Sequence, residues 1–312
     1  MIKSNKPSQH CSDAIYDQRK ILEKLKGSPA YFPDAIAEKQ SLVNFTTETI
    51  RRLRESVKFH IPYGGDIMID MFNGMAFKES IKNYLSTYRL PFPLVALEYD
   101  FIVNEENSAD FIENNLPYTA TVILVHEELR DDQNPLLYVR LINKIFSPYS
   151  KKYEWHCLPY DIVVDFDKCR IDDHFAYFTS IIPINESYMA DHNYKDFLND
   201  TENELGVLLQ FLIAMSCRNV TSNPEPAPSA IENKKRMKKG LEKRYEYRNI
   251  IINTKNGVSD VTRKHSSQGG TVATHIRRGH IRHYENKNVW IEQTVVNADK
   301  GQIPAIKKYV VK

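Results

Sequence analysis

A change of hydrophobic period in the middle of the chain is the feature that most constrains its fold. Five short segments there are rich in β-branched and aromatic residues and are bounded by Pro, Asn and Asp clusters: 94–103, 119–125, 136–146, 160–166 and 175–182. This pattern is typical of strands. Because no helical pattern alternates with the segments, they favour a mostly antiparallel sheet and give no support for a doubly wound fold.

Helical spacing of apolar residues frames this region. Residues 12–26 and 34–57 each place leucine and isoleucine on one face, and the first pattern ends at Gly-Ser-Pro. We expect a short strand at 67–72, a third helix at 75–84, and a closing helix at 194–218 with an acidic N-terminal stretch. The prediction is an α+β fold: N-terminal helices, a central mostly antiparallel sheet, a closing helix and a small basic C-terminal segment containing strands.

The stretch after the closing helix predicts a boundary. It carries three prolines at alternate positions, which is typical of a semi-extended linker. We therefore predict an acidic α+β body over residues 1–220, a Pro-rich linker over 221–232 and a basic segment over 233–312. Strands are expected in that segment at 245–252, 289–296 and 305–311, the last two forming a terminal β-hairpin.

Charge is distributed unevenly between these parts. Residues 231–312 carry a formal charge of +12, whereas residues 1–230 carry −10, although the whole chain has a net charge of only +2. Such asymmetry points to contact with nucleic acid or a membrane surface. The polar N-terminus lacks the apolar core of a secretory signal, and the longest apolar run, around 207–215, is too short to span a bilayer. We expect a cytoplasmic protein with no membrane partner.

The densest basic stretch is residues 234–248, with eight Lys or Arg and two Glu. Cations at this density neutralise phosphates and release counterions, and aromatic side chains nearby can stack on unpaired bases. The alternatives are a solvated arm that balances the acidic body, or a membrane-surface contact, which lacks an accompanying apolar face. The residues expected to bind RNA are Lys234, Lys235, Arg236, Lys238, Lys239, Lys243, Arg244 and Arg248, with Tyr245 and Tyr247 stacking.

A second cluster, Thr274-His-Ile-Arg-Arg-Gly-His-Ile-Arg-His283, combines three His with three Arg. Arginine forks match phosphate geometry, and histidine exchanges protons near neutral pH. The cluster therefore predicts phosphate or peptide contact without chemistry, with structural packing and a metal-independent ribonuclease as alternatives. The three histidines could also ligate a metal, although no carboxylate or cysteine stands at ligand spacing. The RNA-binding candidates are Arg277, Arg278 and Arg282, and the catalytic candidates are His275, His280 and His283.

Other chemical motifs give weaker signals. The four cysteines lie far apart, and the pairing of His156-Cys157 with Cys169 and His174 matches no common metal-ligand spacing. Carboxylates at strand ends could form a metal-dependent nuclease centre but equally face solvent: Glu98, Asp100, Asp161, Asp165 and Asp167. The chain has no P-loop, no G-x-G-x-x-G and no G-x-S-x-G, so nucleotide-binding and hydrolase functions lack support. We expect neither a metal nor a cofactor.

The segment His275-Ile-Arg-Arg-Gly-His280, followed by Val289-Trp290 and a glycine-containing turn, resembles the C-terminus of a type V-A anti-CRISPR family. That family blocks production of the type V-A effector nuclease. The stretches Asn233-Lys-Lys-Arg-Met-Lys-Lys-Gly and Tyr245-Glu-Tyr are similar to the same family and its phage and plasmid homologues. The sequence departs from the pattern at Thr274, where Pro is usual, and at Ile281, where an aromatic residue often stands.

The resemblance implies a protein that recognises the N-terminal part of a target as it is translated, after which the corresponding mRNA is lost. On this interpretation the acidic body holds a nascent peptide of a target such as a CRISPR effector, through an exposed sheet edge. The basic segment approaches RNA or the ribosome. The rival hypotheses are a ribonuclease that uses the His/Arg cluster and a structural phage protein whose tail condenses nucleic acid.

Overall fold

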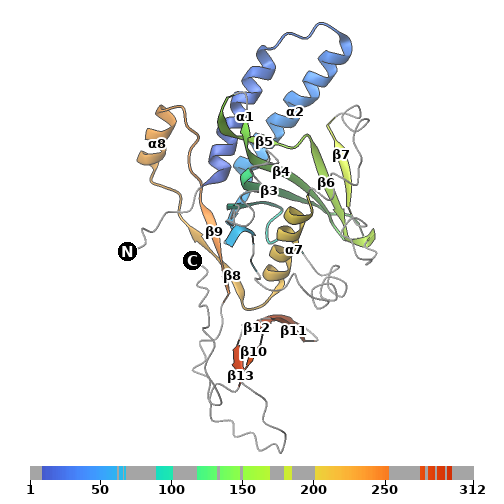
Figure 1. The fold of residues 1–312 in the computed structure, drawn as a ribbon, viewed down its shortest axis with the longest axis vertical. Coiled ribbons are helices and arrows are strands. Elements are labelled where there is room, and N and C mark those ends of the chain that lie inside the picture. Colours follow the sequence, from blue (N-terminus) through green and yellow to red (C-terminus); the bar gives the residue numbers. More distant parts are fainter. Residues whose placement is uncertain are drawn as a thin grey trace, which may run out of the picture.

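The computed structural model describes residues 9–61, 63–65, 67, 89–100, 118–131, 134–147, 150–168, 179–184, 201–252, 275–277, 280–284, 287–291 and 294–296. Its centre is a nine-stranded sheet with the order β7-β6-β4-β3-β2-β1-β9-β8, to which β5 adds beside the end of β4 (Figure 1). Most neighbouring strands are antiparallel, but β1 runs parallel to both β2 and β9. The strands are β1 (Val57–His60), β2 (Leu94–Asp100), β3 (Tyr118–Glu128), β4 (Leu136–Ser147), β5 (Lys152–Cys157), β6 (Tyr160–Asp165), β7 (Thr179–Pro183), β8 (Val220–Glu225) and β9 (Tyr247–Ile252).

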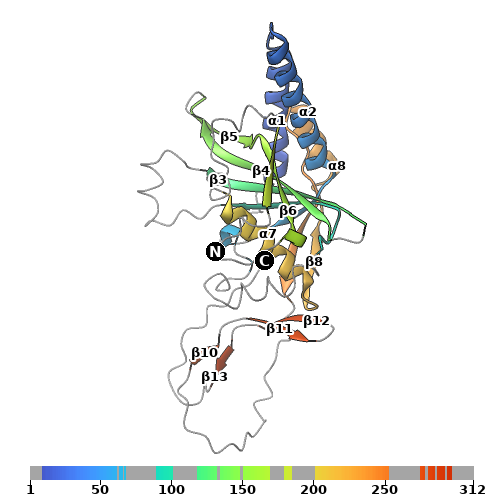
Figure 2. The same ribbon diagram turned by 90° about the vertical axis from the view of Figure 1, so that its right-hand side faces the viewer.

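Helices cover both faces of this sheet. The helix α7 (Glu202–Ser216) packs on one face, and α1 (His10–Gly27) and α2 (Pro33–Glu55) pack on the other, as Figure 2 shows. Successive side chains of a strand point to opposite faces. In β2, Val95, Leu97 and Tyr99 accordingly belong to the core beneath α7, whereas Ala96 belongs to the core beneath α1 and α2.

The α+β fold, the N-terminal helices and the mostly antiparallel sheet are confirmed. So are the central strands and the closing helix, as far as the described residues reach. The strands β1 and β5 were not predicted. β1 begins one residue after α2, so its apolar residues continue the helical pattern in the sequence. β5 buries only Trp155 among its six residues, so it lacks a clear strand pattern. Of the strand expected at 67–72, only Ile67 is described, and the helix expected at 75–84 lies outside the described residues.

Two short 3-10 turns, Tyr63–Gly65 and Phe166–Lys168, complete the helical elements beside the four α-helices of the described chain. None of the helices in this described part is long and apolar enough to cross a lipid bilayer.

The structure differs from the sequence expectation at the proline-rich stretch. Residues 220–225 form β8, which pairs along its whole length with β9, so the chain leaves the sheet and returns to it. Between the two strands lies the fourth helix, α8 (Ala230–Lys238). Proline is compatible with an edge strand because such a strand needs hydrogen bonds on one side only. The first part of the basic segment is thereby joined to the body through a shared sheet.

The remaining strands form two small antiparallel pairs. β10 (His275–Arg277) pairs with β13 (Thr294–Val296), and β11 (His280–Tyr284) pairs with β12 (Lys287–Ile291). The strand expected at 289–296 thus falls on β12 and β13. Its expected partner at 305–311 lies outside the described residues.

Candidate nucleic-acid interface

The helix α8 begins and ends at clear local signals. The Ser229 hydroxyl accepts a hydrogen bond from the Glu232 backbone N–H, and the Glu232 carboxylate accepts one from the Ser229 backbone N–H, which is a capping box. Lys235, Arg236 and Lys238 lie in the last turn, where positive charge interacts favourably with the negative end of the helix dipole. Gly240 then adopts a positive φ of 76°, a conformation that glycine takes readily, and reverses the chain.

Residues 239–246 fold back along α8, and we call residues 229–246 the hook. The side chain of Asn233 accepts a hydrogen bond from the Arg244 backbone N–H at 2.8 Å and donates one to the Arg244 carbonyl at 3.0 Å. Arg236 Nε donates to the Glu242 carbonyl at 3.2 Å. These contacts join the two limbs of the hook, so α8 holds its shape although none of its residues is buried.

A buried carboxylate anchors the hook to the N-terminal helices. Glu242 accepts hydrogen bonds from Arg54 Nη2 at 2.9 Å and from the Tyr245 hydroxyl at 3.0 Å, and Arg19 lies 3.5 Å away. Burial would raise the pKa of Glu242, but the hydrogen bonds from Arg54 and Tyr245 and the two arginine charges outweigh it and hold that pKa below its usual value. Glu242 therefore stays ionised and ties α1, α2 and the hook together.

Tyr245, one of the two expected stacking residues, is engaged within the protein. Its backbone exchanges two hydrogen bonds with the side-chain amide of Gln9, at 3.0 and 3.1 Å. The Nζ atoms of Lys58 and Lys243 lie 4.3 and 5.0 Å from the centre of its ring. Burial and the neighbouring Glu242 raise the pKa of its hydroxyl. Tyr247 lies half-buried on β9, where it pairs with Glu225 of β8.

The basic residues of the hook divide into inward and outward groups. Arg236 points inward, toward Glu242 and to within 3.8 Å of Asp13. Arg248, beyond the hook on β9, donates to Ser222 and stacks 5.0 Å from the ring of Phe92. Arg244 is half-buried and Lys243 exposed. The four lysines of the outward group, all exposed, are Lys234, Lys235, Lys238 and Lys239.

The three candidate catalytic histidines lie on two different small sheets. His275 pairs with Val296 in the β10–β13 pair, whereas His280 and His283 pair with Ile291 and Asn288 in the β11–β12 pair. Arg277 lies on β10 and Arg282 on β11, while Arg278 lies outside the described residues. A catalytic role for the histidines stays a prediction.

The carboxylates considered for a metal-dependent nuclease have structural partners. Glu98 accepts the backbone N–H groups of His10 and Cys11 at 2.9 and 3.3 Å, which satisfies the N-terminus of α1. Asp165 and Asp167 both accept from Arg130. Among the described residues, no three His, Cys, Asp or Glu side chains gather as a metal site. Cys169 and His174 lie outside them.

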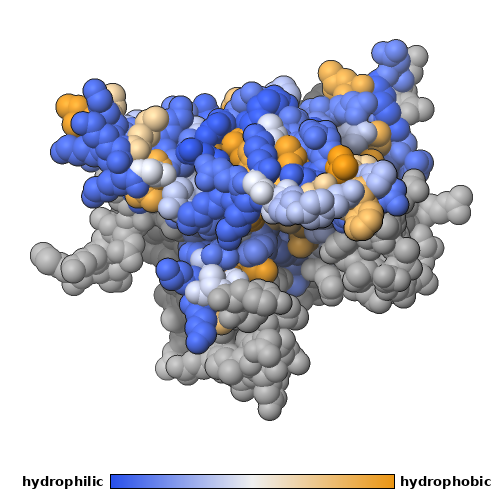
Figure 3. Space-filling view, turned by 90° about the horizontal axis from the view of Figure 1, so that it is seen from above, coloured by the Kyte–Doolittle hydropathy of each residue, from blue (hydrophilic) through white to orange (hydrophobic). Residues whose placement is uncertain are grey.

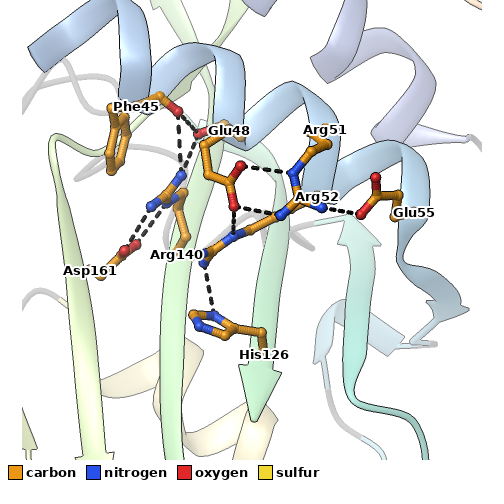
Figure 4. A network of polar contacts seen from close by, with 9 residues as sticks. Phe45, Glu48, Arg51, Arg52, Glu55, His126, Arg140 and Asp161 are labelled. Carbon is orange, nitrogen blue, oxygen red and sulfur yellow. Dashed lines mark hydrogen bonds and ion pairs between the residues drawn. The ribbon is translucent and has the colours of Figure 1, made fainter. Parts of the chain in front are cut away.

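Asp161 belongs to a polar network beneath α2 (Figure 4). Both of its oxygens accept from Arg140 at 2.7 Å, and Arg140 also donates to the Thr49 hydroxyl at 2.7 Å and stacks on the Phe45 ring. Nearby, Arg52 lies between Glu48 and the Nδ1 atom of His126. Every charge drawn there has an opposite or hydrogen-bonding partner, which is the arrangement of a structural network and not of an open site.

Residues 84–298 match the model of the anti-CRISPR type V subtype A2 family, and this range is more than half of the chain. The chain belongs to this family. Searches of the curated proteins and of the solved structures gave no significant match. The family expected from the C-terminal motifs is thus confirmed, and the chain is an anti-CRISPR-like protein. The matched range includes the hook and the His/Arg cluster but not α1 and α2.

The anchoring of the hook is the part of this candidate interface that sequence reasoning missed. In the sequence, Glu242 is one of two acidic residues in a basic run, and nothing local marks it as an anchor. A carboxylate within a run of cations is the signal that could have found it, because an acidic residue in a phosphate-binding stretch weakens binding unless it has another partner.

Proposed function

We propose that this anti-CRISPR-like protein lowers production of its target by contacting the translating mRNA or ribosome through the hook while its body holds the nascent target polypeptide. The observation that carries the RNA part is the outward row of four exposed lysines on an anchored helix. Fixed cations neutralise phosphates and release counterions without base specificity. Anchoring keeps the row in one place, so less conformational entropy is lost on binding.

The peptide part of the proposal concerns the two ends of the sheet. β8 ends one side and contains Pro224, which has no N–H and makes strand addition unfavourable. β7 ends the other side of the described sheet, and a hollow of about 280 Å³ lies beside it, lined by residues such as Tyr138, Ser180 and Ile182. Ile182 is 51% exposed there. These features favour β7 as the edge to which an extended peptide adds.

Replacing the four outward lysines by glutamine tests the RNA part. Arg236 is left unchanged because it binds Glu242 within the hook. Binding of the full-length chain to a labelled single-stranded RNA is measured as a function of salt. Each lost phosphate contact lowers the slope of log affinity against log salt by about 0.7, so we expect a slope smaller by up to about 3.

The matched control removes four cations from other surfaces: Lys144→Gln, Lys151→Gln, Lys152→Gln and Arg218→Gln. We expect this variant to retain the RNA affinity and salt slope of the wild type. In translating cells, the four-lysine variant should lose repression of the target and the control should keep it. Equal RNA binding by the two variants would contradict the proposal.

A further inference from the structure

The side of α1 that faces the hook carries a row of cations. The Ser12 hydroxyl donates to the Lys243 carbonyl at 2.8 Å, and Asp13 and Arg19 approach Arg236 and Glu242. Each helical residue turns by about 100°, so residues 7, 11 or 14 positions apart share one side. On this rule Lys20 and Lys24 lie above Asp13, and Lys26 lies above Ser12 and Arg19.

This row adds positive charge beyond the hook. Between residues 19 and 27, α1 carries Arg19, Lys20, Lys24 and Lys26 and one acidic residue, Glu23. The side chains of Arg19 and Lys20 are 46% and 51% exposed. Lys24 and Lys26 are exposed too. Lys20 pairs with Asp17 at 3.5 Å, whereas Lys24 and Lys26 have no acidic side chain at ion-pair distance among the described residues.

Exposed aromatic residues stand where this row ends. The connection between α1 and α2 presents Tyr31 at 81% and Phe32 at 73% exposure, and Ile36 follows at 52%. Figures 1 and 2 show that the two helices extend beyond the sheet, which places this tip away from the core. Lys39 Nζ donates to the carbonyls of Lys26 and Ser28 at 3.2 and 2.6 Å and so fixes the connection.

The exposed rings of Tyr31 and Phe32 at this tip indicate a surface that a binding partner covers. Figure 3, seen from above, shows separate apolar patches in a mostly hydrophilic surface. Three side chains at a tip are far fewer than the roughly 20–30 residues that each side of a stable protein interface contributes, so the tip alone does not build a dimer. The cations that lead from the hook to the tip favour a polyanion. Among polyanions, only an unpaired strand offers base faces on which aromatic rings can stack.

We infer that single-stranded RNA runs from the hook along α1 to the tip, where Tyr31 and Phe32 stack on unpaired bases. This inference rests on the proposed RNA contact of the hook and names the form of RNA that it takes. From Asp13 to Gly27 the helix rises about 20 Å. The combination of a basic track and an aromatic platform is the one that sequence-tolerant single-strand binders use.

The test places a fluorescent probe at the tip through Phe32→Trp in the full-length chain. Of the two natural tryptophans, Trp155 is 1% exposed and Trp290 lies on β12. We expect a 16-nucleotide oligouridine to quench the new tryptophan, since stacking brings a base onto the indole, and a duplex of equal length not to quench it. Absence of quenching when binding is saturated, as read from labelled-RNA anisotropy, would overturn the inference.

A loss-of-contact variant gives a second readout. Tyr31→Ala with Phe32→Ala should weaken oligouridine binding by about fivefold to a hundredfold per lost stack. Leu129→Ala, at a side chain that is 79% exposed, is the matched control and should bind as the wild type does. Unchanged RNA affinity in the double variant, with target repression lost, would assign the tip to a protein partner and overturn the inference.

The two proposals fail in different ways. If the four-lysine variant of the hook loses RNA affinity while the tip variant keeps it, the RNA contact of the hook stands and the track along α1 does not. If the four-lysine variant binds RNA as the wild type does, the proposed function fails as well.

Discussion

The two faces of the central sheet are built by different means. Beneath α7 the core is a large apolar cluster in which Phe59, Phe211 and Leu212 are at most 1% exposed, and α7 adds the buried polar side chains of Glu204 and Gln210. Beneath α1 and α2 a smaller apolar cluster is joined by buried polar groups, among them Glu98, Arg140 and Lys58. Burial of apolar surface stabilises the fold but is not directional. Hydrogen bonds and ion pairs between buried polar groups also specify how the elements are oriented. The hook is anchored to α1 and α2, the helices that cover this second face.

The largest expected effect is on the apolar face. Phe211→Ala removes a ring that packs edge-on against Phe59, with ring centres 4.9 Å apart, and leaves a cavity under α7. Substitutions of this kind lower the free energy of unfolding by about 3–5 kcal/mol. Urea titration monitored by circular dichroism measures the loss. A loss below about 1 kcal/mol would show that α7 packs less tightly than its burial indicates.

The next effect is on the polar face. Arg140→Met leaves Asp161 and Thr49 without their donor, and breaking such a buried pair costs about 3 kcal/mol. Arg140→Met with Asp161→Leu removes both charges, and we expect the double variant to unfold at higher urea than the single one. Equal or lower stability of the double variant would mean that the ion pair itself stabilises this face.

The stability of the polar face should also depend on pH, through His126. Burial, together with the nearby Arg52, lowers the pKa of His126 to about 4, and Arg52 donates to its Nδ1 atom, which must be unprotonated. The unfolded chain therefore binds the proton more readily, and stability present above pH 6.5 is lost as the pH falls toward 4. Because His126 is half-exposed, we expect about 1–2 kcal/mol.

The measurement is thermal unfolding between pH 4 and 7. In His126→Gln this part of the pH dependence should disappear, while the control His156→Gln, at a histidine half-exposed on β5, should retain it. A wild-type pH dependence in His126→Gln would place the titrating group elsewhere.

The smallest effect concerns the anchor of the hook. Glu242→Gln keeps an acceptor for Arg54 and Tyr245 but removes the charge, at a cost of about 1 kcal/mol near neutral pH. The pKa of Glu242 is held below its usual value, so its contribution is present above the unfolded pKa and is lost as the pH falls through the folded one. The stability difference between Glu242→Gln and wild type should therefore shrink at acid pH. Hydrogen exchange of α8 should increase in the variant.

The sequence was sufficient for much of the fold because short-range periodicity determines it. The β-branched runs of β2, β3, β4, β6 and β7 and the helical spacing of α1, α2 and α7 each follow from a local pattern. β1 was missed because it follows α2 directly, and β8 because alternate prolines indicate a linker unless a partner strand is known. Pairing with β9 is a long-range contact that no local pattern contains.

For the candidate interface, too, some features follow from the sequence and others only from the tertiary structure. The sequence alone determined the charge asymmetry, the basic run and the motifs that placed the chain in its family, because these depend only on which residues are present. The tertiary structure alone decided that Arg236 and Tyr245 face inward while Lys234 and Lys238 face outward. The physical reason is Glu242. Its buried carboxylate takes a hydrogen bond from the Tyr245 hydroxyl, and its backbone carbonyl takes one from Arg236, so these two side chains turn inward while the four lysines stay exposed.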